Sequence, residues 1–389
     1  MNTNDLRVAL FSGNYNYVRD GANQALNRLV GYLLRQGVQV RVYSPTVAEP
    51  AFPPTGDLVS VPSVAILGRP EYRLPLALPA SVRRDLEEFA PNIVHVSSPD
   101  IVGHRAVSWA RKRKIAVVAS VHTRFETYLE YYHLQTLEPL VRAGLRRFYH
   151  RCEVVLAPAE STALILRAQR MNRNIEIWTR GIDRDQFNPE RRDMEWRRSQ
   201  GIADDEMVVA YLGRIVMEKG LDVFADAIHA FAPLGLEHRV LVIGDGPARG
   251  WFEQQLPNAI FTGQQTGTDL ARALASADVF LNPSVTEAFG NVTLEAMACA
   301  LPVIAAVASG TTSLVRPGVT GLLADGTEPD EFAEALAAYA RDPELRRQHG
   351  AAGLEIARTM DWDTINSAVV RAYKHAIVKR ERLTRMTGR

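Results

Sequence analysis

Two carboxylates on either side of a glycine, in the stretch TEAFGNVTLE, could bind a phosphorylated ligand rich in hydroxyl groups. Glu287 follows the apolar run VFLNPS, and Gly290 allows close approach of the backbone. A helix is predicted from about Asn291, and its unpaired N–H groups at Asn291 and Val292 would attract phosphate. Glu295 lies one turn further along. Ionised carboxylates accept hydrogen bonds, so this pair suits sugar and ribose hydroxyls.

The pair alone also fits a solvated loop carboxylate and a carboxylate that complements a helix dipole. A second charged pair supports the binding site. Arg214 and Lys219, in YLGRIVMEKG, follow another apolar run across a strand-to-helix turn. A guanidinium offers a planar fork and an ammonium a compact charge, so both could point at one diphosphate. Each of them alone would be read as ordinary surface charge.

Short β-branched runs that alternate with helical stretches must position these residues. Such runs, separated by helices, are typical of buried parallel strands. The first series comprises residues 6–12, 38–45, 93–99, 115–122 and 154–158, with helical stretches at 21–36 and 126–150. The second series comprises residues 208–214, 238–246, 259–263, 279–284 and 302–306. The fold class expected is α/β, with two doubly wound Rossmann-like domains whose strand ends face a cleft.

The predicted domains are 1–190 for the acceptor and 191–362 for the nucleotide sugar. A helix at 363–389 is expected to pack back on the first domain. The charged stretch RGIDRDQFNPERRDMEWRRSQGIADDE has no strand period and is predicted to be the linker. These assignments put both charged pairs in loops that follow strands of the second domain, where ligands bind in open α/β folds.

Composition is that of an ordinary soluble enzyme. The chain has 389 residues, 47% of them hydrophobic and 23% charged, and a formal net charge of +1. No global field favours nucleic acid, and the two cysteines indicate neither a metal site nor disulfides. The start MNTNDLRVALFSG lacks the features of a signal peptide, and no apolar run is long enough to span a bilayer. We expect a cytoplasmic protein.

Several motifs stand in the order of a known family. They are GRIVMEKGLDVF, VIGDGP, FTG, the run LASADVFLNPSVTEAFGNVTLEAMACALPVIAA and GVTGLLAD. Together they resemble the nucleotide-sugar domain of retaining family 4 glycosyltransferases, which have the GT-B fold. The first half is also similar to the family, and its residues 122–158 most resemble bacterial α-mannosyltransferases and glycolipid-forming members. The chain departs from the family pattern in having Ala300 where glycine is common and Asp20-Gly21 where two glycines are usual.

The resemblance implies roles for particular residues. Donor-binding residues would be Gly21, Arg214, Lys219, Phe289, Gly290, Asn291, Val292 and Glu295, with the first three near the diphosphate and Glu295 on the ribose. Glu287 and His122 would be catalytic, at the transferred sugar. His122 follows the strand at 115–122, and from its position alone it is as often a core histidine as a ligand. Tyr15, Arg19 and Arg124 are expected to bind the acceptor.

The resulting hypothesis is a retaining hexosyltransferase that uses GDP-mannose or a UDP-hexose and needs neither metal nor cofactor. The acceptor is a hydroxyl compound, expected to be a membrane lipid, with a polysaccharide or small molecule as the alternative. The basic helix at 140–151, with Arg142, Arg146 and Arg147, fits either an anionic membrane surface on the inner face of the cell membrane or a helix that covers the sheet. A nicotinamide oxidoreductase is the rival class, but SGNYNYVRDG lacks its glycine fingerprint. A non-catalytic sugar-nucleotide-binding protein is the third possibility.

Overall fold

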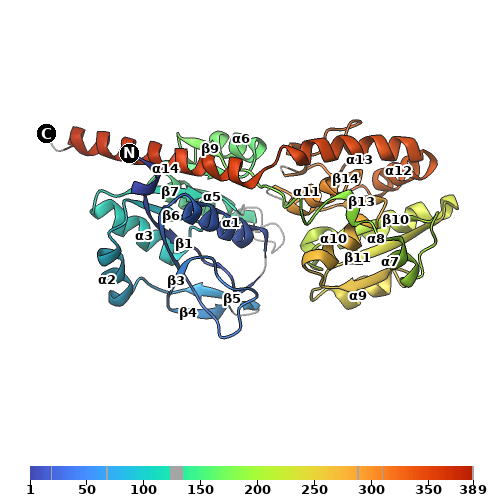
Figure 1. The fold of residues 1–389 in the computed structure, drawn as a ribbon, viewed down its shortest axis with the longest axis horizontal. Coiled ribbons are helices and arrows are strands. Elements are labelled where there is room, and N and C mark those ends of the chain that lie inside the picture. The colour runs from blue at the N-terminus through green and yellow to red at the C-terminus, as the bar shows by residue number, and fades with distance from the viewer. Residues whose placement is uncertain (19, 67–68, 123–134, 287–288, 309, 388–389) are drawn as a thin grey trace. The chain divides into compact units, whose positions relative to one another are not determined.

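The computed structural model describes residues 1–18, 20–66, 69–122, 135–286, 289–308 and 310–387. The chain divides into two compact units (Figure 1). The first unit combines Met1–Arg180 with Trp362–Arg389, and the second is Gly181–Asp361. The sequence placed the first boundary between residues 190 and 191, and the structure places it between 180 and 181.

The described part of the first unit contains a parallel sheet of seven strands in the order β3-β2-β1-β6-β7-β8-β9. Its strands are β1 (Arg7–Phe11), β2 (Gln39–Ser44), β3 (Asp57–Ser60), β6 (Ile93–Val96), β7 (Ala116–Ser120), β8 (Val154–Ala157) and β9 (Ile175–Ile177). The central strands β6, β7 and β8 are buried along their whole length, which is why they read as continuous apolar runs. The antiparallel hairpin of β4 (Ser63–Ile66) and β5 (Arg69–Pro75) forms a separate small sheet.

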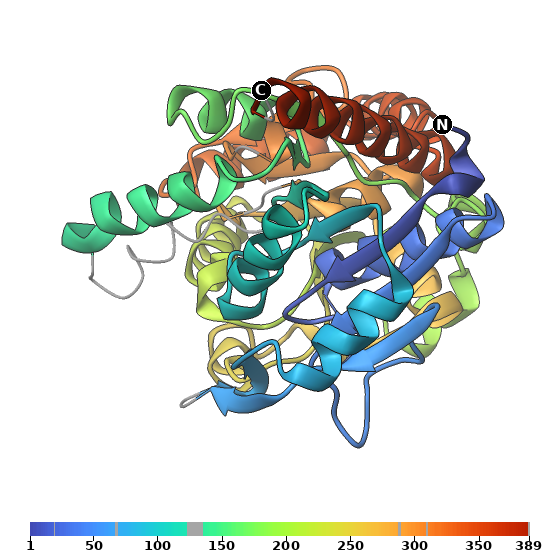
Figure 2. The same ribbon diagram turned by 90° about the vertical axis from the view of Figure 1, so that its left-hand side faces the viewer.

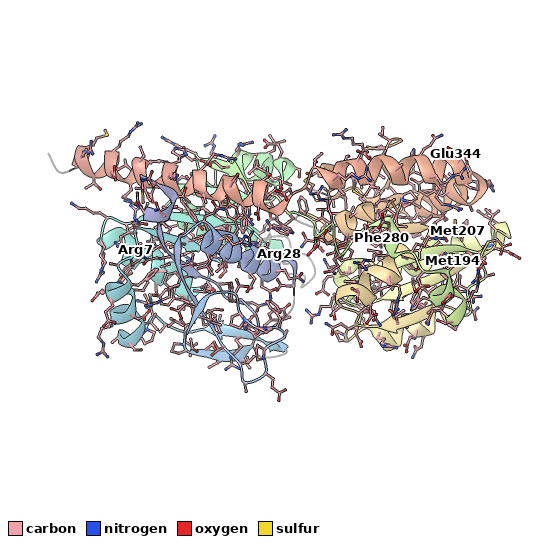
Figure 3. All side chains as sticks on the ribbon, viewed as in Figure 1. Arg7, Arg28, Met194, Met207, Phe280 and Glu344 are labelled. Atoms are coloured by element: carbon pink, nitrogen blue, oxygen red, sulfur yellow. The ribbon has the colours of Figure 1, made fainter. Side chains whose placement is uncertain are left out.

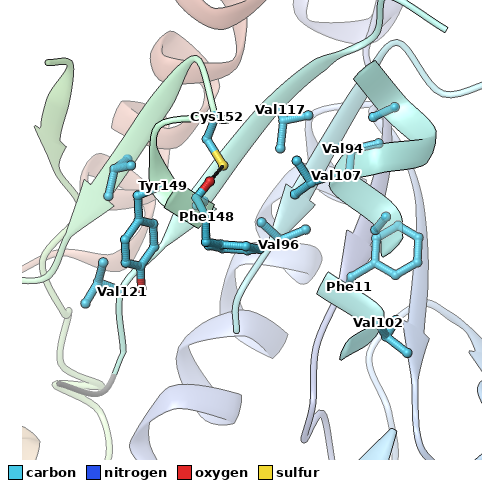
Figure 4. Close-up of a cluster of buried hydrophobic side chains, with 14 of the residues drawn as sticks. Phe11, Val94, Val96, Val102, Val107, Val117, Val121, Phe148, Tyr149 and Cys152 are labelled. Carbon is cyan, nitrogen blue, oxygen red and sulfur yellow. Dashed lines mark hydrogen bonds between the residues drawn. The ribbon is translucent and has the colours of Figure 1, made fainter. Parts of the chain in front are cut away.

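Helices cover both faces of this sheet. They are α1 (Gly21–Arg35), α2 (Ala80–Phe89), α3 (Ile101–Lys112), α5 (Glu138–Tyr149), α6 (Glu160–Ala168) and α14 (Trp362–Thr387). Side chains of α2, α3, α5 and α6 form one apolar cluster with one face of the sheet, part of which Figure 4 shows. Side chains of α1 and α14 form the cluster on the other face, where the two helices lie together (Figures 1 and 2). The C-terminal helix therefore returns to the first unit.

The described part of the second unit contains a parallel sheet of six strands in the order β12-β11-β10-β13-β14-β15. The strands are β10 (Met207–Leu212), β11 (His238–Ile243), β12 (Ile260–Gly263), β13 (Val279–Asn282), β14 (Val303–Ala306) and β15 (Gly321–Ala324). The helices are α7 (Met194–Ser199), α8 (Leu221–Phe231), α9 (Arg249–Gln255), α10 (Gly267–Ala275), α11 (Asn291–Ala298), α12 (Pro329–Arg341) and α13 (Pro343–Arg358). Single-turn 3-10 helices occur at Thr3–Asp5, Gln135–Leu137, Pro189–Arg191, Met217–Lys219, Ala232–Leu234 and Thr311–Ser313.

The charged stretch at residues 180–206, predicted to be the linker, packs into the second unit over most of its length. From Gly181 onward it belongs to the second unit, and Arg197 in α7 is fully buried. The Arg197 guanidinium donates to the carbonyl oxygens of Ser276 and Glu206 at 2.8 and 2.6 Å. Figure 3 labels Met194 in this helix and Met207 at the start of β10. The charges therefore attach the segment to the fold.

The turn that ends α11 contains Ala300, one of the departures from the family pattern. Ala300 has φ +59°, in the left-handed region where a side chain is strained. The Ala300 N–H donates to the Met297 carbonyl and the Leu301 N–H to the Ala296 carbonyl, both at 3.0 Å. These two bonds are those of a Schellman motif, whose left-handed position is normally glycine.

Replacing Ala300 with glycine is expected to raise the free energy of unfolding by about 0.5–1 kcal/mol, because relief of strain exceeds the added chain entropy. Urea unfolding measures the change. Ala335→Gly, within α12, is the matched control and should lower stability by about 1 kcal/mol. A loss of stability in both variants would contradict the assignment.

Candidate functional site

The strand order of the second unit defines where a ligand would bind. The chain runs outward from β10 through β11 to β12, then returns to the other side of β10 as β13. Both β11 and β13 pair in parallel with β10, so the order reverses between β10 and β13. Ligands of open α/β sheets bind at the carboxyl ends of the strands at such a switch point. The loops after β10 and β13 carry Arg214, Lys219 and the TEAFGNVTLE stretch.

The loop after β10, which carries Arg214 and Lys219, is held by close backbone contacts. A Cβ atom at Gly244 would lie 1.9 Å from the Gly213 oxygen, and one at Gly246 would lie 2.3 Å from the Ile215 oxygen. The following loop can pack this closely only because these residues are glycines. The Tyr211 hydroxyl also donates to the Arg214 carbonyl at 3.0 Å. The two cations therefore project from a fixed backbone.

The loops after β10 and β13 also contact each other. The Thr286 hydroxyl donates to the Glu218 carbonyl at 3.3 Å. Gly220 has φ +72°, and a Cβ atom there would lie 3.0 Å from the Pro283 oxygen. The structure thus brings the Arg214–Lys219 loop against the loop that leads into α11, as the diphosphate hypothesis requires.

Among the described residues, no side chain caps the N-terminus of α11. The helix begins at Asn291, and its N-cap residue is Gly290, with φ +92°. Glycine provides no side chain to accept the N–H groups of the first turn, so these groups can bind an anion. The Asn291 amide oxygen is buried and has no hydrogen-bond partner among the described residues. Phe289, just before the helix, is buried in the core.

Glu295 lies in the second turn of α11, half-buried. Burial raises the pKa of its carboxyl group to about 8. The carboxyl is therefore largely protonated near neutral pH unless hydroxyl donors compensate for the lost hydration, as two ribose hydroxyls would. Its partner in the predicted pair, Glu287, lies outside the described residues.

The start of α1 differs from that of α11. Gly21 is its first residue, and the N-cap is Asp20, whose carboxylate accepts the Asn23 N–H at 2.8 Å. The Asn23 amide oxygen accepts the Asp20 N–H at 3.1 Å, which completes a capping box. A carboxylate already occupies this helix start, so a phosphate is disfavoured there. The predicted contact of Gly21 with a diphosphate stays a prediction, and α11 is the better anion site.

His122 lies two residues beyond β7, and both of its ring nitrogens are engaged by the protein. Nε2 lies 2.8 Å from the Ser120 hydroxyl and Nδ1 lies 3.0 Å from an Arg180 guanidinium nitrogen. Burial, and then the charge of Arg180, hold the pKa of His122 well below its usual range. The imidazole is therefore neutral. Sequence reasoning missed Arg180 and Ser120, although a serine at the end of an apolar strand is a sign of a buried hydrogen bond.

Of the three predicted acceptor residues, the structure describes only Tyr15. Tyr15 is fully buried, and its hydroxyl donates to the Thr55 carbonyl at 2.7 Å. This placement makes its side chain a core element and speaks against direct contact with an acceptor. Arg19 and Arg124 lie outside the described residues.

The described residues contain no group of three or more His, Cys, Asp or Glu side chains placed to hold a metal ion. Two stretches, 183–185 and 361–363, have Asp-x-Asp spacing, which binds a metal in some sugar transferases. Here Asp183 accepts the Gln186 N–H at 3.2 Å and Asp363 pairs with Arg35 at 2.5 Å. Within the same residues, no helix combines the length and apolarity needed to cross a bilayer.

Two open parallel sheets in two units are the architecture of a GT-B glycosyltransferase. Comparison with known protein families supports this assignment. A family model described as Glycosyltransferase Family 4 matches residues 19–186, and one described as Glycosyl transferases group 1 matches residues 206–342. This chain belongs to glycosyltransferase family 4.

Individual relatives cover nearly the whole chain. The GDP-mannose-dependent alpha-mannosyltransferase of Mycolicibacterium smegmatis is 31% identical over 96% of this chain and 99% of its own. The enzyme of the same description from Corynebacterium glutamicum is 30% identical over 84% of this chain and 78% of its own. Anabaena HepE in complex with UDP has a TM-score of 0.74 at 20% identity, covering 95% of this chain and all of its own.

Proposed function

We propose that this chain is a retaining α-mannosyltransferase that transfers mannose from GDP-mannose to a hydroxyl acceptor. The observation that carries the proposal is the start of α11, which no described side chain caps, after a loop that contacts the loop of Arg214 and Lys219 at the switch point. GDP-mannose is favoured over a UDP-hexose because the two relatives above are both described as GDP-mannose-dependent.

In the proposed reaction the bond between the anomeric carbon and the diphosphate oxygen breaks. Arg214, Lys219 and the N–H groups at the start of α11 stabilise the charge that develops on the leaving diphosphate. The acceptor oxygen attacks from the same face, and its proton moves to a leaving phosphate oxygen. His122 contributes to the sugar site as a neutral group, since its ring nitrogens are both occupied. Glu287 remains the second proposed contact of the transferred sugar.

Incubation with GDP-mannose is expected to release GDP, slowly with water and faster with an acceptor, and the mannoside formed should have the α configuration of the donor. Turnover should persist in excess chelator, because side chains and helix N–H groups supply the positive charge. UDP-glucose and NAD serve as comparison ligands in a thermal-shift assay. Turnover that needs added magnesium or manganese, or a β product, would refute this part of the proposal.

For the acceptor we propose a membrane lipid, with α5 near the bilayer surface. One side of α5 covers the sheet, because Leu145 and Phe148 are buried in the core. On its exposed side, Leu140 has 72% of its surface accessible and the preceding Leu137 has 44%. Arg142 pairs with Glu138 in the same helix. One side of α5 can therefore cover the sheet while its other side faces a membrane surface, so the two interpretations of this helix are compatible.

A second basic surface of the first unit supports an anionic partner. A groove of about 630 Å³ between α2 and α3 is lined by Arg83, Arg84, Arg105, Lys112 and Arg113, with Glu87 as its acidic residue. The hairpin β4–β5 carries exposed apolar side chains, including Val64 and Ile66. A basic groove and exposed apolar side chains in the same unit are features expected of a protein that rests on a membrane.

Vesicle co-sedimentation should show binding to anionic vesicles and little to neutral ones. Each basic side chain near the surface contributes about 1 kcal/mol, and the binding should weaken with salt. Joint replacement of Arg142, Arg146 and Arg147 by serine should reduce the bound fraction. The matched control, with the same change of charge in the second unit, replaces Arg341, Arg347 and Arg358 by serine. Indifference to both vesicle types, with full activity on a soluble sugar, would favour the polysaccharide or small-molecule acceptor.

A further inference from the structure

Five buried or half-buried polar side chains of the first unit form a continuous series of hydrogen bonds that ends at His122. The Tyr373 hydroxyl on α14 lies 2.7 Å from Nδ1 of His95 on β6. His95 Nε2 lies 2.9 Å from the Ser120 hydroxyl at the end of β7. Ser120 lies 2.8 Å from His122 Nε2, and His122 Nδ1 lies 3.0 Å from Arg180 Nη2. The series therefore joins the C-terminal helix to the proposed sugar site.

Arg180 sets the direction of the two bonds that His122 makes. A guanidinium only donates, so His122 Nδ1 must accept, and the proton of the neutral ring lies on Nε2. That N–H donates to the Ser120 oxygen. If the Ser120 hydroxyl in turn donates to His95 Nε2, the proton of His95 lies on Nδ1 and donates to Tyr373. Burial lowers the pKa of His95 to about 3, so this ring is neutral as well.

Arg180 is itself held in place on several sides. It is 4% exposed, and its Nη1 donates to the carbonyl oxygens of Trp178 and Thr179 at 3.0 and 3.1 Å. Its guanidinium lies over the Trp178 ring, 5.0 Å from the centroid. The Trp178 N–H donates to Asn366 on α14 at 3.1 Å, and the ring meets His122 edge-on at 5.6 Å. A group fixed in this way can determine the orientation of the ring next to it.

We propose that Arg180 is a positioning residue that locks His122 in its Nε2–H tautomer, so that its ring nitrogens take no part in proton transfer. The charged or titratable side chains that face His122 among the described residues are Arg180, from the segment after β9, and His95, from β6. Ser120 and Trp178 are the neutral neighbours. The expected effect of Arg180 on mannosyl transfer rests on the proposed function. The tautomer of His122 can be tested independently of that function.

Nitrogen-15 NMR of histidine-labelled full-length protein tests the tautomers without substrate, with His95→Asn and His122→Asn used for assignment. We expect His122 to carry its proton on Nε2 and His95 on Nδ1, with neither ring titrating between about pH 5 and 8. Arg180→Met should leave His122 with mixed tautomers and a raised pKa, and Arg180→Lys, which still donates, should retain the Nε2–H form.

With an acceptor present, Arg180→Met should lower kcat by roughly tenfold to a hundredfold with little change in KM for the donor, and Arg180→Lys should recover part of that loss. A wild-type His122 with its proton on Nδ1, or no change of tautomer in Arg180→Met, would overturn the proposal. The wild-type spectrum alone shows which nitrogen of His122 carries the proton, so it tests the proposal even if Arg180→Met does not fold. Correct tautomers without any mannosyl transfer would refute the proposed function and leave the positioning of His122 intact.

Discussion

Replacing Arg214 with alanine is expected to weaken binding of GDP and of GDP-mannose by roughly ten- to a hundredfold, and Lys219→Ala should act similarly. Each change removes a charge-assisted hydrogen bond to the diphosphate, worth about 1.5–3 kcal/mol. The loop of both residues is fixed by the glycines at 244 and 246, so no neighbouring backbone shift is expected to compensate. Titration calorimetry with GDP measures the change.

The control for this prediction is Arg347→Ala, which removes one exposed arginine of α13, in the same unit and away from both loops. It should bind GDP like the wild type. The unfolding midpoints of all three variants should stay close to the wild-type value, since neither Arg214 nor Lys219 belongs to the buried core. Unchanged affinity in both site variants would show that the diphosphate binds elsewhere.

Replacing Arg197 with alanine is expected to lower the free energy of unfolding by about 3–5 kcal/mol, because it removes one of the two arginines that pair with Asp278 and leaves three carbonyl acceptors without their buried donor. The guanidinium is fully buried and lies 2.9 Å from Asp278. It also donates to the carbonyl oxygens of Ser276, Ala203 and Glu206. These bonds join the segment after the domain boundary to the sheet, so urea unfolding of the full chain should show an early transition of the second unit.

The neighbouring Arg198 provides a matched control. It pairs with Asp204 at 2.6 Å, but both side chains are more than half exposed, so Arg198→Ala should lower the free energy of unfolding far less than Arg197→Ala does. The pH dependence gives a second check. Arg192 and Arg197, with a hydrogen bond from the Val208 N–H, outweigh burial and hold the pKa of Asp278 below its usual range. Its stabilisation is present above its unfolded pKa of about 4 and is lost as pH falls through the folded value. Equal costs for Arg197→Ala and Arg198→Ala would contradict this account.

Much of the fold could be predicted because buried parallel strands are nearly continuous apolar runs. The runs at 93–99, 115–122 and 208–214 correspond to β6, β7 and β10. The strands missed were short or half-exposed, such as β3 at the sheet edge and β15 just after a turn. Their apolar pattern is too brief to distinguish from that of a loop.

The candidate site was partly predictable for a related reason. Residues that follow a buried strand must lie at its carboxyl end, so Arg214, Lys219 and Asn291 could be assigned to one edge of the sheet from the sequence alone. The helix start at Asn291 and the glycine before it are local features and are also confirmed.

The sequence by itself determined the two series of strands, the loops that carry the cations and the membership of family 4. Only the tertiary structure decided that Tyr15 is a core residue, that Arg197 is buried and that Arg180 meets His122. Arg180 and His122 come together because β7, β8 and β9 are neighbours in the sheet, which carries their ends to the same edge. Periodicity reports whether a residue faces the core, but it contains no information about which distant residue it will meet there. That is set by strand order and helix packing, and it decides whether a charged or polar side chain is solvated, structural or part of the site.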